Sequence, residues 1–251
     1  MNAPPATFNA ADYALFLDID GTLVEFAAEP GLVEIDSPLL ETLQFLQRTL
    51  NGALALVSGR GLADIDSLFG SERFPAAGAH GSELRHADGQ RDDPTAVPFP
   101  GILRDWAERF VSSSDGLLLE HKTTGLSLHY RGAPERHAEV REFADSVLSE
   151  LGDSHRMIAG KMVYEIAPRH HNKGEAIVQL MTREPFAGRR PIFLGDDITD
   201  EDGFSAVIER NGVAILVGQR EATAAQFSLQ DVTAVRHWLA GAFKASANQE
   251  H

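Results

Sequence analysis

The chain has 251 residues, contains no cysteine and carries a formal net charge of −15, from 37 acidic residues against 22 lysines and arginines. The lack of cysteine excludes disulfides, thiolate catalysis and thiolate-bound metals. The acidic balance argues against nucleic acids and anionic membranes as partners, because both repel a negative protein. No signal pattern and no apolar run of the roughly 20 residues that span a bilayer are present. We therefore expect a cytoplasmic protein.

The first expected element is a buried strand over the apolar residues 13–17, and the sequence DIDGT follows it directly. The side chains of Asp18 and Asp20 should point the same way, because they stand two apart in an extended segment. Two like charges held together are costly without a cation between them, and carboxylate oxygens suit Mg²⁺. Gly21 would allow a sharp turn that brings backbone N–H groups close to an anion.

The next elements alternate between helix and strand. Apolar spacing predicts a helix from Pro38, with Ser37 as its N-cap. The segments that follow are expected to be a strand over 53–57, a helix over 62–69 and a strand from 75. This alternation predicts a parallel α/β sheet.

The middle of the chain has a different pattern, in which a helix and a hairpin occur twice. The helices are expected over 98–111 and 134–151, and the strands over 117–120, 126–130, 156–158 and 162–166. A helix over 174–181 and strands over 191–194 and 213–217 then restore the parallel pattern. We expect a discontinuous α/β core, residues 1–84 and 169–251, with an α+β cap inserted at 85–168 and a hinge within 88–100.

Two further segments carry groups that suit an anion. Ser58, Gly59 and Arg60 follow the second strand; the Ser58 hydroxyl could donate to a phosphate oxygen, and Gly59 would leave room for the anion. Ser58 could also be the N-cap of the next helix, and Arg60 could reach either the phosphate or the cap. Lys173 precedes a helix, where it would be a fixed positive charge, or a lysine exposed to solvent.

The strand expected over 191–194 ends in a second acidic segment, with five acidic residues in the seven positions from Asp196 to Asp202. An acidic surface turn rarely places so many carboxylates directly behind a buried strand. In this order, the two acidic strand ends, the Ser-Gly turn and the lysine resemble the motifs of the haloacid dehalogenase superfamily of phosphoryl-transfer enzymes. The resemblance implies a Rossmann-like core sheet with a cap.

The chemistry expected at these motifs is phosphoryl transfer. With no cysteine and a carboxylate beside a metal, the nucleophile should be Asp18, which would form an aspartyl-phosphate. Asp20 is placed to protonate the leaving oxygen and then to activate water. Mg²⁺, Lys173, Ser58 and the backbone N–H groups near Ile19 and Asp20 would neutralise the phosphoryl charge. The resemblance implies that Asp18, the Asp20 carbonyl and Asp196 hold Mg²⁺, while Asp197 and Asp200 position the ligands and Lys173; the division among these three aspartates stays open.

Segments in and beside the cap resemble the trehalose-6-phosphate phosphatase family more specifically. They are Gly78–Glu83, Glu120–Lys122 with Leu128–Arg131, Gly160–Glu165 and Gly195–Glu201, and His121 stands where an acidic or amide residue is expected. The resemblance implies trehalose 6-phosphate as substrate. A disaccharide needs buried hydrogen-bond partners for its hydroxyls, and the cap residues that could supply them are Glu120, Lys122, Lys161 and Glu165. His80, His129 and Arg131 are weaker candidates.

Other interpretations remain open. The same core chemistry would serve a phosphatase for another sugar phosphate, or a phosphomutase. A phospho-acceptor regulatory module also carries an acidic cluster and a lysine, but it lacks a cap and needs a lasting phospho-aspartate, which a well-placed Asp20 would hydrolyse. The charged cap residues could instead be solvated hairpin side chains. We expect the protein to act as a monomer.

Overall fold

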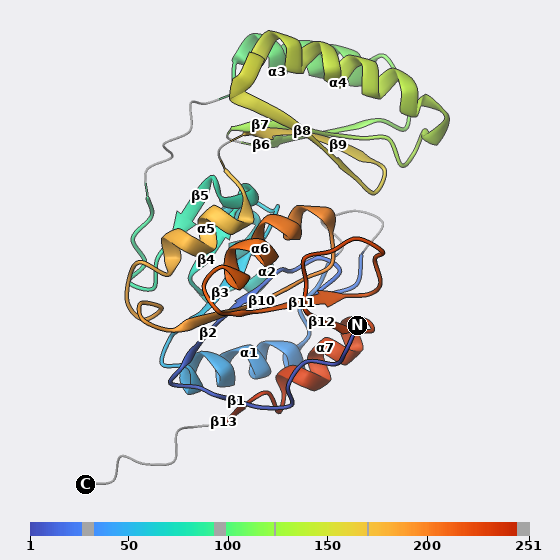
Figure 1. Cartoon of the computed structure of the whole chain (residues 1–251). Helices are drawn as coiled ribbons and strands as arrows, with labels where there is room; N and C mark the ends of the chain where they lie inside the picture. Colours follow the sequence, from blue (N-terminus) through green and yellow to red (C-terminus); the bar gives the residue numbers. More distant parts are fainter. Residues whose placement is uncertain (27–32, 93–98, 123, 170, 245–251) are drawn as a thin grey trace, which may run out of the picture. The chain divides into compact units, whose positions relative to one another are not determined.

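The computed structural model describes residues 1–26, 33–92, 99–122, 124–169 and 171–244. The chain forms two compact units, which are Met1–Asp92 together with Asn172–His251, and Asp93–His171; both are drawn in Figure 1. Among the described residues, no helix combines the length and the apolar character that crossing a membrane requires.

The first unit is built on a seven-stranded sheet with the strand order β12-β11-β10-β2-β3-β4-β5. All neighbouring strands are parallel except β5, which runs antiparallel to β4 at the edge. The strands are β2 (Tyr13–Leu17), β3 (Leu54–Val57), β4 (Ala76–Gly78), β5 (Glu83–Arg85), β10 (Arg190–Gly195), β11 (Val213–Val217) and β12 (Phe227–Leu229). This sheet confirms the expected α/β core.

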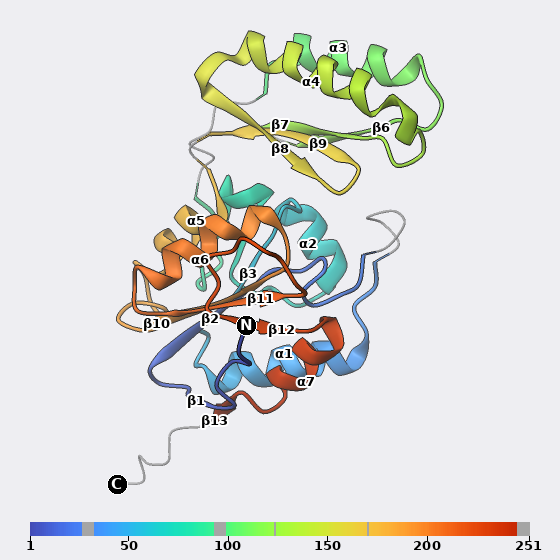
Figure 2. The same cartoon turned by 45° about the vertical axis from the view of Figure 1, so that its right-hand side comes forward.

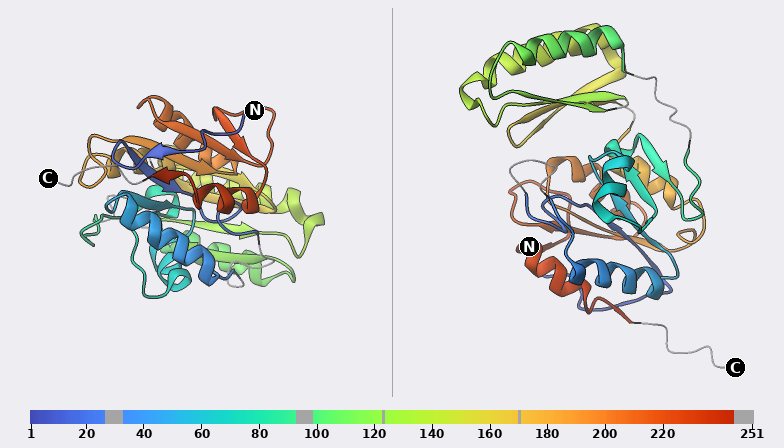
Figure 3. Two further views of the ribbon diagram at one scale, coloured as in Figure 1. Left: turned by 90° about the horizontal axis from the view of Figure 1, so that it is seen from below. Right: turned by 180° about the vertical axis from the view of Figure 1, so that it is seen from behind.

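Helices cover both faces of the core sheet. Helices α1 (Ser37–Thr49) and α7 (Val232–Leu239) lie side by side on one face, and α5 (Lys173–Leu180) and α6 (Glu201–Ile208) lie on the other (Figures 2 and 3). Helix α2 is Leu62–Phe69, and the short strands β1 (Phe8–Asn9) and β13 (Phe243–Lys244) form a separate parallel pair. Because both faces are covered, the central strands are apolar throughout, and Phe16, Leu17 and Leu194 are fully buried.

The second unit is the expected α+β cap. Its four-stranded antiparallel sheet has the order β6-β7-β9-β8, and α3 and α4 cover one face of it (Figure 2). The elements are α3 (Gly101–Ser112), β6 (Leu118–Lys122), β7 (Gly125–His129), α4 (His137–Leu151), β8 (His155–Gly160) and β9 (Val163–Pro168). Short 3₁₀ turns at Pro134–Arg136 and Gly152–Ser154 flank α4.

The units divide the chain later than the sequence pattern suggests. The pattern places the boundaries at 84/85 and 168/169, whereas the compact units divide at 92/93 and 171/172. Strand β5 explains the first difference, because it pairs with β4 and Arg85 is buried against the Phe74 carbonyl oxygen, 3.0 Å from its Nε. Residues 93–98 of the expected hinge lie outside the described part of the chain.

The N-cap expected at Ser37 is wrong by one residue. Asp36 is extended and its Oδ1 accepts a hydrogen bond from the Leu39 N–H at 3.0 Å, so α1 begins at Ser37. The Leu39 N–H and the Arg236 guanidinium both lower the pKa of Asp36. Two adjacent residues of cap-forming type cannot be ranked by spacing alone, since each would satisfy a helix N-terminus.

Replacing the true cap should therefore cost stability where replacing Ser37 does not. Asp36→Ala should lower the free energy of unfolding by about 1 kcal/mol, because the Leu39 N–H loses its acceptor. Asp36→Asn should lose less, since an amide oxygen can still cap. Urea unfolding of both variants and of Ser37→Ala measures the difference; an equal loss in Ser37→Ala would show that the cap is misassigned.

Candidate active site

The expected motif residues gather at one edge of the core sheet. Strands β10, β2 and β3 are parallel neighbours, with Leu194 paired to Leu17 and Leu17 to Leu56. The residues that follow each strand therefore meet at the shared carboxyl edge, where open α/β sheets bind ligands. The Asp18 N–H donates to the Leu194 carbonyl oxygen at 3.0 Å, which fixes the segment that begins at Asp18 beside the acidic segment that begins at Asp196.

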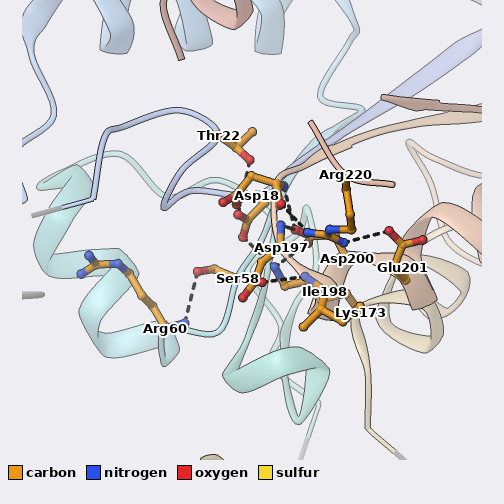
Figure 4. A network of polar contacts seen from close by, with 11 residues as sticks. Asp18, Thr22, Ser58, Arg60, Lys173, Asp197, Ile198, Asp200, Glu201 and Arg220 are labelled. Atoms are coloured by element: carbon orange, nitrogen blue, oxygen red, sulfur yellow. Dashed lines mark hydrogen bonds and ion pairs between the residues drawn. The ribbon is translucent and has the colours of Figure 1, made fainter. Parts of the chain in front are cut away.

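A buried ion cluster lies at the centre of this edge (Figure 4). Lys173 Nζ is 2.8 Å from Asp18 Oδ1 and 2.6 Å from Asp200 Oδ1. All three side chains are buried, and Asp200 is fully so. Burial disfavours the ammonium, but the charges of Asp18 and Asp200 outweigh it and raise the pKa of Lys173. Lys173 is therefore a fixed cation, as the functional interpretation of its motif expected, and is not exposed to solvent.

A third carboxylate completes the cluster. Asp18, Asp196 and Asp200 each offer an oxygen, and these oxygens all lie within 4.8 Å of one another. Burial raises the pKa of Asp18 well above its usual value, which Lys173 offsets only in part. Burial, and next the charge of Asp200, raise the pKa of Asp196 to about 7. Three carboxylates beside one ammonium leave an excess of negative charge, which a cation would compensate.

The geometry around Asp196 fits a metal ion. Its Oδ1 is buried and has no hydrogen-bond partner among the described residues. Gly21, at a φ of +82°, approaches so closely that a Cβ there would lie 2.2 Å from Asp196 Oδ2. Only glycine permits both this backbone conformation and this approach. A set of carboxylate oxygens suits a hard cation such as Mg²⁺.

The other aspartates of the second acidic segment are bound by protein donors. Asp200 Oδ2 accepts hydrogen bonds from the Asp196 and Asp197 N–H groups, both at 2.9 Å, while its Oδ1 accepts from Lys173. Asp197 Oδ1 accepts from the Ile198 N–H at 2.7 Å and caps the following turn. These contacts favour positioning roles for Asp197 and Asp200.

The turn at Ser58 differs in two ways from its expected form. Ser58 is not the N-cap of α2: that position is Gly61, and the Leu62 N–H donates to Glu83 Oε2 at 2.7 Å. The buried Ser58 Oγ accepts from the Arg60 N–H at 3.1 Å, which leaves its own proton to donate to an anion. A Cβ at Gly59 would lie 2.6 Å from His80 Nε2, so the imidazole fills the space beside this glycine.

Asp20 lies in a different arrangement from the one expected. Its carboxylate is held by Arg60, with Nε–Oδ2 at 2.6 Å and Nη2–Oδ1 at 2.7 Å, and it is not part of the Asp18 cluster. The chain turns after Ile19, whose carbonyl oxygen accepts from the Leu23 N–H at 2.8 Å. The alternation of an extended strand therefore does not continue to Asp20, and the carboxylates grouped closely enough to share a metal ion are those of Asp18, Asp196 and Asp200.

Within the cap, three of the four predicted sugar-binding residues, Glu120, Lys122 and Glu165, share one face of the sheet. Leu126, Leu128, Tyr164 and Ile166 pack beneath α3 and α4, so the alternate residues of β6, β7 and β9 lie on the opposite face. On that face Lys122 Nζ is 2.7 Å from Glu165 Oε2, and His129 Nε2 is 3.0 Å from Glu120 Oε2. Burial opposes the charge of Glu120, but the His129 hydrogen bond and the Lys122 charge together lower its pKa.

The remaining cap candidates lie elsewhere. Lys161 is exposed in the turn between β8 and β9, and Arg131 is exposed just after β7. His121 lies beside α3, with its Nε2 3.2 Å from Glu108 Oε1. The unexpected residue type at position 121 therefore leaves the polar face unchanged.

Sequence reasoning missed two residues that hold the site. Glu83 binds the start of α2, and Arg220 Nη2 donates to the Asp196 carbonyl oxygen at 2.6 Å. Each of the two residues is distant in the sequence from its partner, and no local sequence pattern indicates either contact.

Solved structures share this fold. A fold comparison matches a phosphatase of the haloacid dehalogenase superfamily, BT1666 from Bacteroides thetaiotaomicron, with a TM-score of 0.58 and 14% identity over 93% of each chain. The C-terminal domain of Candida albicans trehalose-6-phosphate phosphatase matches with a TM-score of 0.75 and 22% identity over 95% of this chain and 98% of that one. These likenesses show that the chain has a fold shared with phosphatases of the haloacid dehalogenase superfamily.

The sequence comparisons specify the family. Residues 16–233 match the trehalose-phosphatase family model, and the chain belongs to this family of phosphoric monoester hydrolases. It is 39% identical to the trehalose-6-phosphate phosphatase of Escherichia coli K12 over 234 residues, 92% of this chain and 86% of that protein. It is 41% identical over 207 residues to a Sinorhizobium fredii protein named "Probable trehalose-phosphate phosphatase", covering 82% and 78% of the two chains.

Stabilisation by Mg²⁺ should increase with pH because of Asp196. With its pKa raised to about 7, the metal-free folded protein keeps a proton that the unfolded chain loses above about pH 4. The metal-free protein should therefore lose stability between about pH 4 and pH 7. Mg²⁺ must displace that proton, so the Tm increase it causes should grow from about pH 6 to pH 8.

Thermal unfolding with and without Mg²⁺ across this pH range measures the effect. Asp196→Asn is the control, since it removes one titrating group and should reduce the pH dependence of the Tm of the metal-free protein. A Mg²⁺-induced Tm increase that is equal at about pH 6 and pH 8 would contradict the assignment of Asp196 as the carboxylate that loses a proton when Mg²⁺ binds.

Proposed function

We propose that the protein hydrolyses trehalose 6-phosphate to trehalose and phosphate through an aspartyl-phosphate at Asp18. Membership of the trehalose-phosphatase family supports the substrate. The observation that carries the chemistry is the buried Lys173 ammonium between Asp18 and Asp200, with the Asp196 carboxylate beside them. Phosphoryl transfer depends mainly on positioning and charge neutralisation, and this cluster supplies both.

In the first step, Asp18 attacks phosphorus and the bond from phosphorus to the sugar oxygen breaks. Lys173 holds Asp18 Oδ1, which leaves Oδ2, 3.4 Å from the Thr22 hydroxyl, to form the new bond. Asp20, oriented by Arg60, gives its proton to the departing sugar oxygen. Ser58 and the backbone N–H groups of Ile19, Asp20 and Gly59 are the proposed partners of the phosphoryl oxygens.

In the second step, water attacks the aspartyl-phosphate. Asp20 takes a proton from this water as its oxygen bonds to phosphorus, and the Asp18 carboxylate leaves. Asp18, Asp196 and the Asp20 carbonyl would hold Mg²⁺, with Asp197 and Asp200 fixing these groups. The bound ion would screen the charge of the phosphoryl oxygens from that of Asp18.

The cap is the proposed determinant of sugar specificity. Its polar sheet face carries paired charges at Lys122 and Glu165 and at Glu120 and His129. Partly buried charged groups of this kind bond hydroxyls and are left unpaired by a sugar that lacks them, which is the physical basis of selectivity. Lys161 is proposed to contribute from the adjacent hairpin turn.

Free phosphate released from a panel of sugar phosphates tests the function. Trehalose 6-phosphate should be strongly preferred, and Asp18→Asn or removal of Mg²⁺ should reduce the rate by at least about a thousandfold, because the nucleophile or its charge partner is lost. Preference for another sugar phosphate would contradict the substrate. Transfer of the phosphoryl group to another position of the sugar, without release of free phosphate, would instead indicate a phosphomutase.

The cap assignment has its own test. Lys122→Met and Glu165→Gln should each lower kcat/KM for trehalose 6-phosphate by about a hundredfold, with a much smaller effect on p-nitrophenyl phosphate, which has no hydroxyls to bind. Glu139 is an exposed α4 residue paired with Arg136, and Glu139→Gln is the matched control. It should leave kcat/KM unchanged for both substrates. Equal losses on both substrates would contradict a role in sugar recognition.

A further inference from the structure

The loop after β11 makes an ionic contact with the acidic segment Asp196–Asp202. No spacing in the sequence indicates this contact. Arg220 lies in this loop, and its guanidinium makes two hydrogen bonds (Figure 4). Nη2 donates to the Asp196 carbonyl oxygen at 2.6 Å, and Nη1 lies 2.9 Å from Glu201 Oε1. The fork of the guanidinium therefore joins the backbone of Asp196 to the first residue of α6.

Glu201 extends the connection to the far side of the same loop. Its second oxygen, Oε2, accepts a hydrogen bond from the Ala224 N–H at 2.8 Å. The Arg220 and Glu201 side chains are only 23% and 21% exposed, so water competes weakly for these contacts. One carboxylate thus holds Arg220 and Ala224 together and anchors the loop on α6.

These contacts restrain Asp196 from the side opposite to Asp200. Asp200 accepts the Asp196 N–H, and Arg220 binds the Asp196 carbonyl oxygen. With both peptide groups held, the backbone that carries the Asp196 carboxylate has little freedom to shift. That carboxylate is the one with a buried oxygen lacking a partner among the described residues.

We propose that Arg220 and Glu201 form a positioning pair that holds Asp196 in the geometry for binding Mg²⁺. The pair raises metal affinity without touching the metal. The proposal rests on the proposed function only in requiring that the acidic cluster binds Mg²⁺. Charge alone makes the opposite prediction, since a guanidinium beside a cation site repels the cation and its removal should tighten binding.

The sign of the change in Mg²⁺ affinity separates the two explanations. Isothermal calorimetry should show the Mg²⁺ Kd of Arg220→Met raised about tenfold or more, in the range seen when groups that orient metal ligands are lost. Arg220→Lys keeps the charge but not the fork, so its Kd should lie between those of wild type and Arg220→Met. Glu201→Gln should also raise the Kd, because an amide has one acceptor oxygen and cannot hold both the Arg220 guanidinium and the Ala224 N–H.

Arg85→Met is the matched control for loss of stability. Arg85 makes a similar fork, with Nη1 2.5 Å from Asp66 Oδ1 and Nε 3.0 Å from the Phe74 carbonyl oxygen. It should lower the Tm without changing the Mg²⁺ Kd.

An unchanged or lower Kd in folded Arg220→Met would overturn the proposal. If Arg220→Met does not unfold cooperatively in EDTA, Arg220→Lys decides, and a Kd equal to that of wild type overturns the proposal. Failure of the wild-type protein to bind Mg²⁺ would overturn the metal site itself, which is a distinct result.

Discussion

The site depends on the burial of the Lys173 ammonium between two carboxylates. A buried charge is tolerated only when it is paired and hydrogen-bonded, and Lys173 meets this condition through Asp18 and Asp200. Asp196 then brings the cluster to three carboxylates against one ammonium, so a divalent cation would complete its charge balance. The pairing also orients Asp18, because one of its oxygens is committed to the lysine and the other stays available for phosphorus.

The fold makes this pairing possible with groups that are far apart in the sequence. The segments after β2, β3 and β10 and the start of α5 contribute Asp18, Ser58, Asp196 and Lys173, and parallel pairing brings the three strand ends together. Asn172 caps α5 by accepting the Glu175 N–H at 2.8 Å, which sets where Lys173 begins the helix. The antiparallel cap follows β5 in the chain and carries a separate set of paired charges on its sheet.

The sequence predicted what depends on local pattern: the apolar strands, the acidic segments that end two of them, and the inserted α+β unit. It did not predict contacts between distant segments. The Arg60–Asp20 pair, the His80 ring beside Gly59 and the Arg220 contact with Asp196 each join residues that no spacing rule connects. The turn after Ile19, which places the Asp20 carboxylate against Arg60, was not expected from the strand pattern, and Asp36 rather than its neighbour Ser37 caps α1.

Trapping the phosphorylated enzyme tests the central claim most directly. Asp20→Asn mixed with p-nitrophenyl phosphate and Mg²⁺ should accumulate an aspartyl-phosphate, because this leaving group needs no proton whereas the attacking water needs a base. Mass spectrometry after an acid quench should find one added phosphoryl group, on the peptide that contains Asp18 and at that residue. A stoichiometric burst of p-nitrophenol with Asp18 unmodified, or with the phosphoryl group on another residue, would contradict the account.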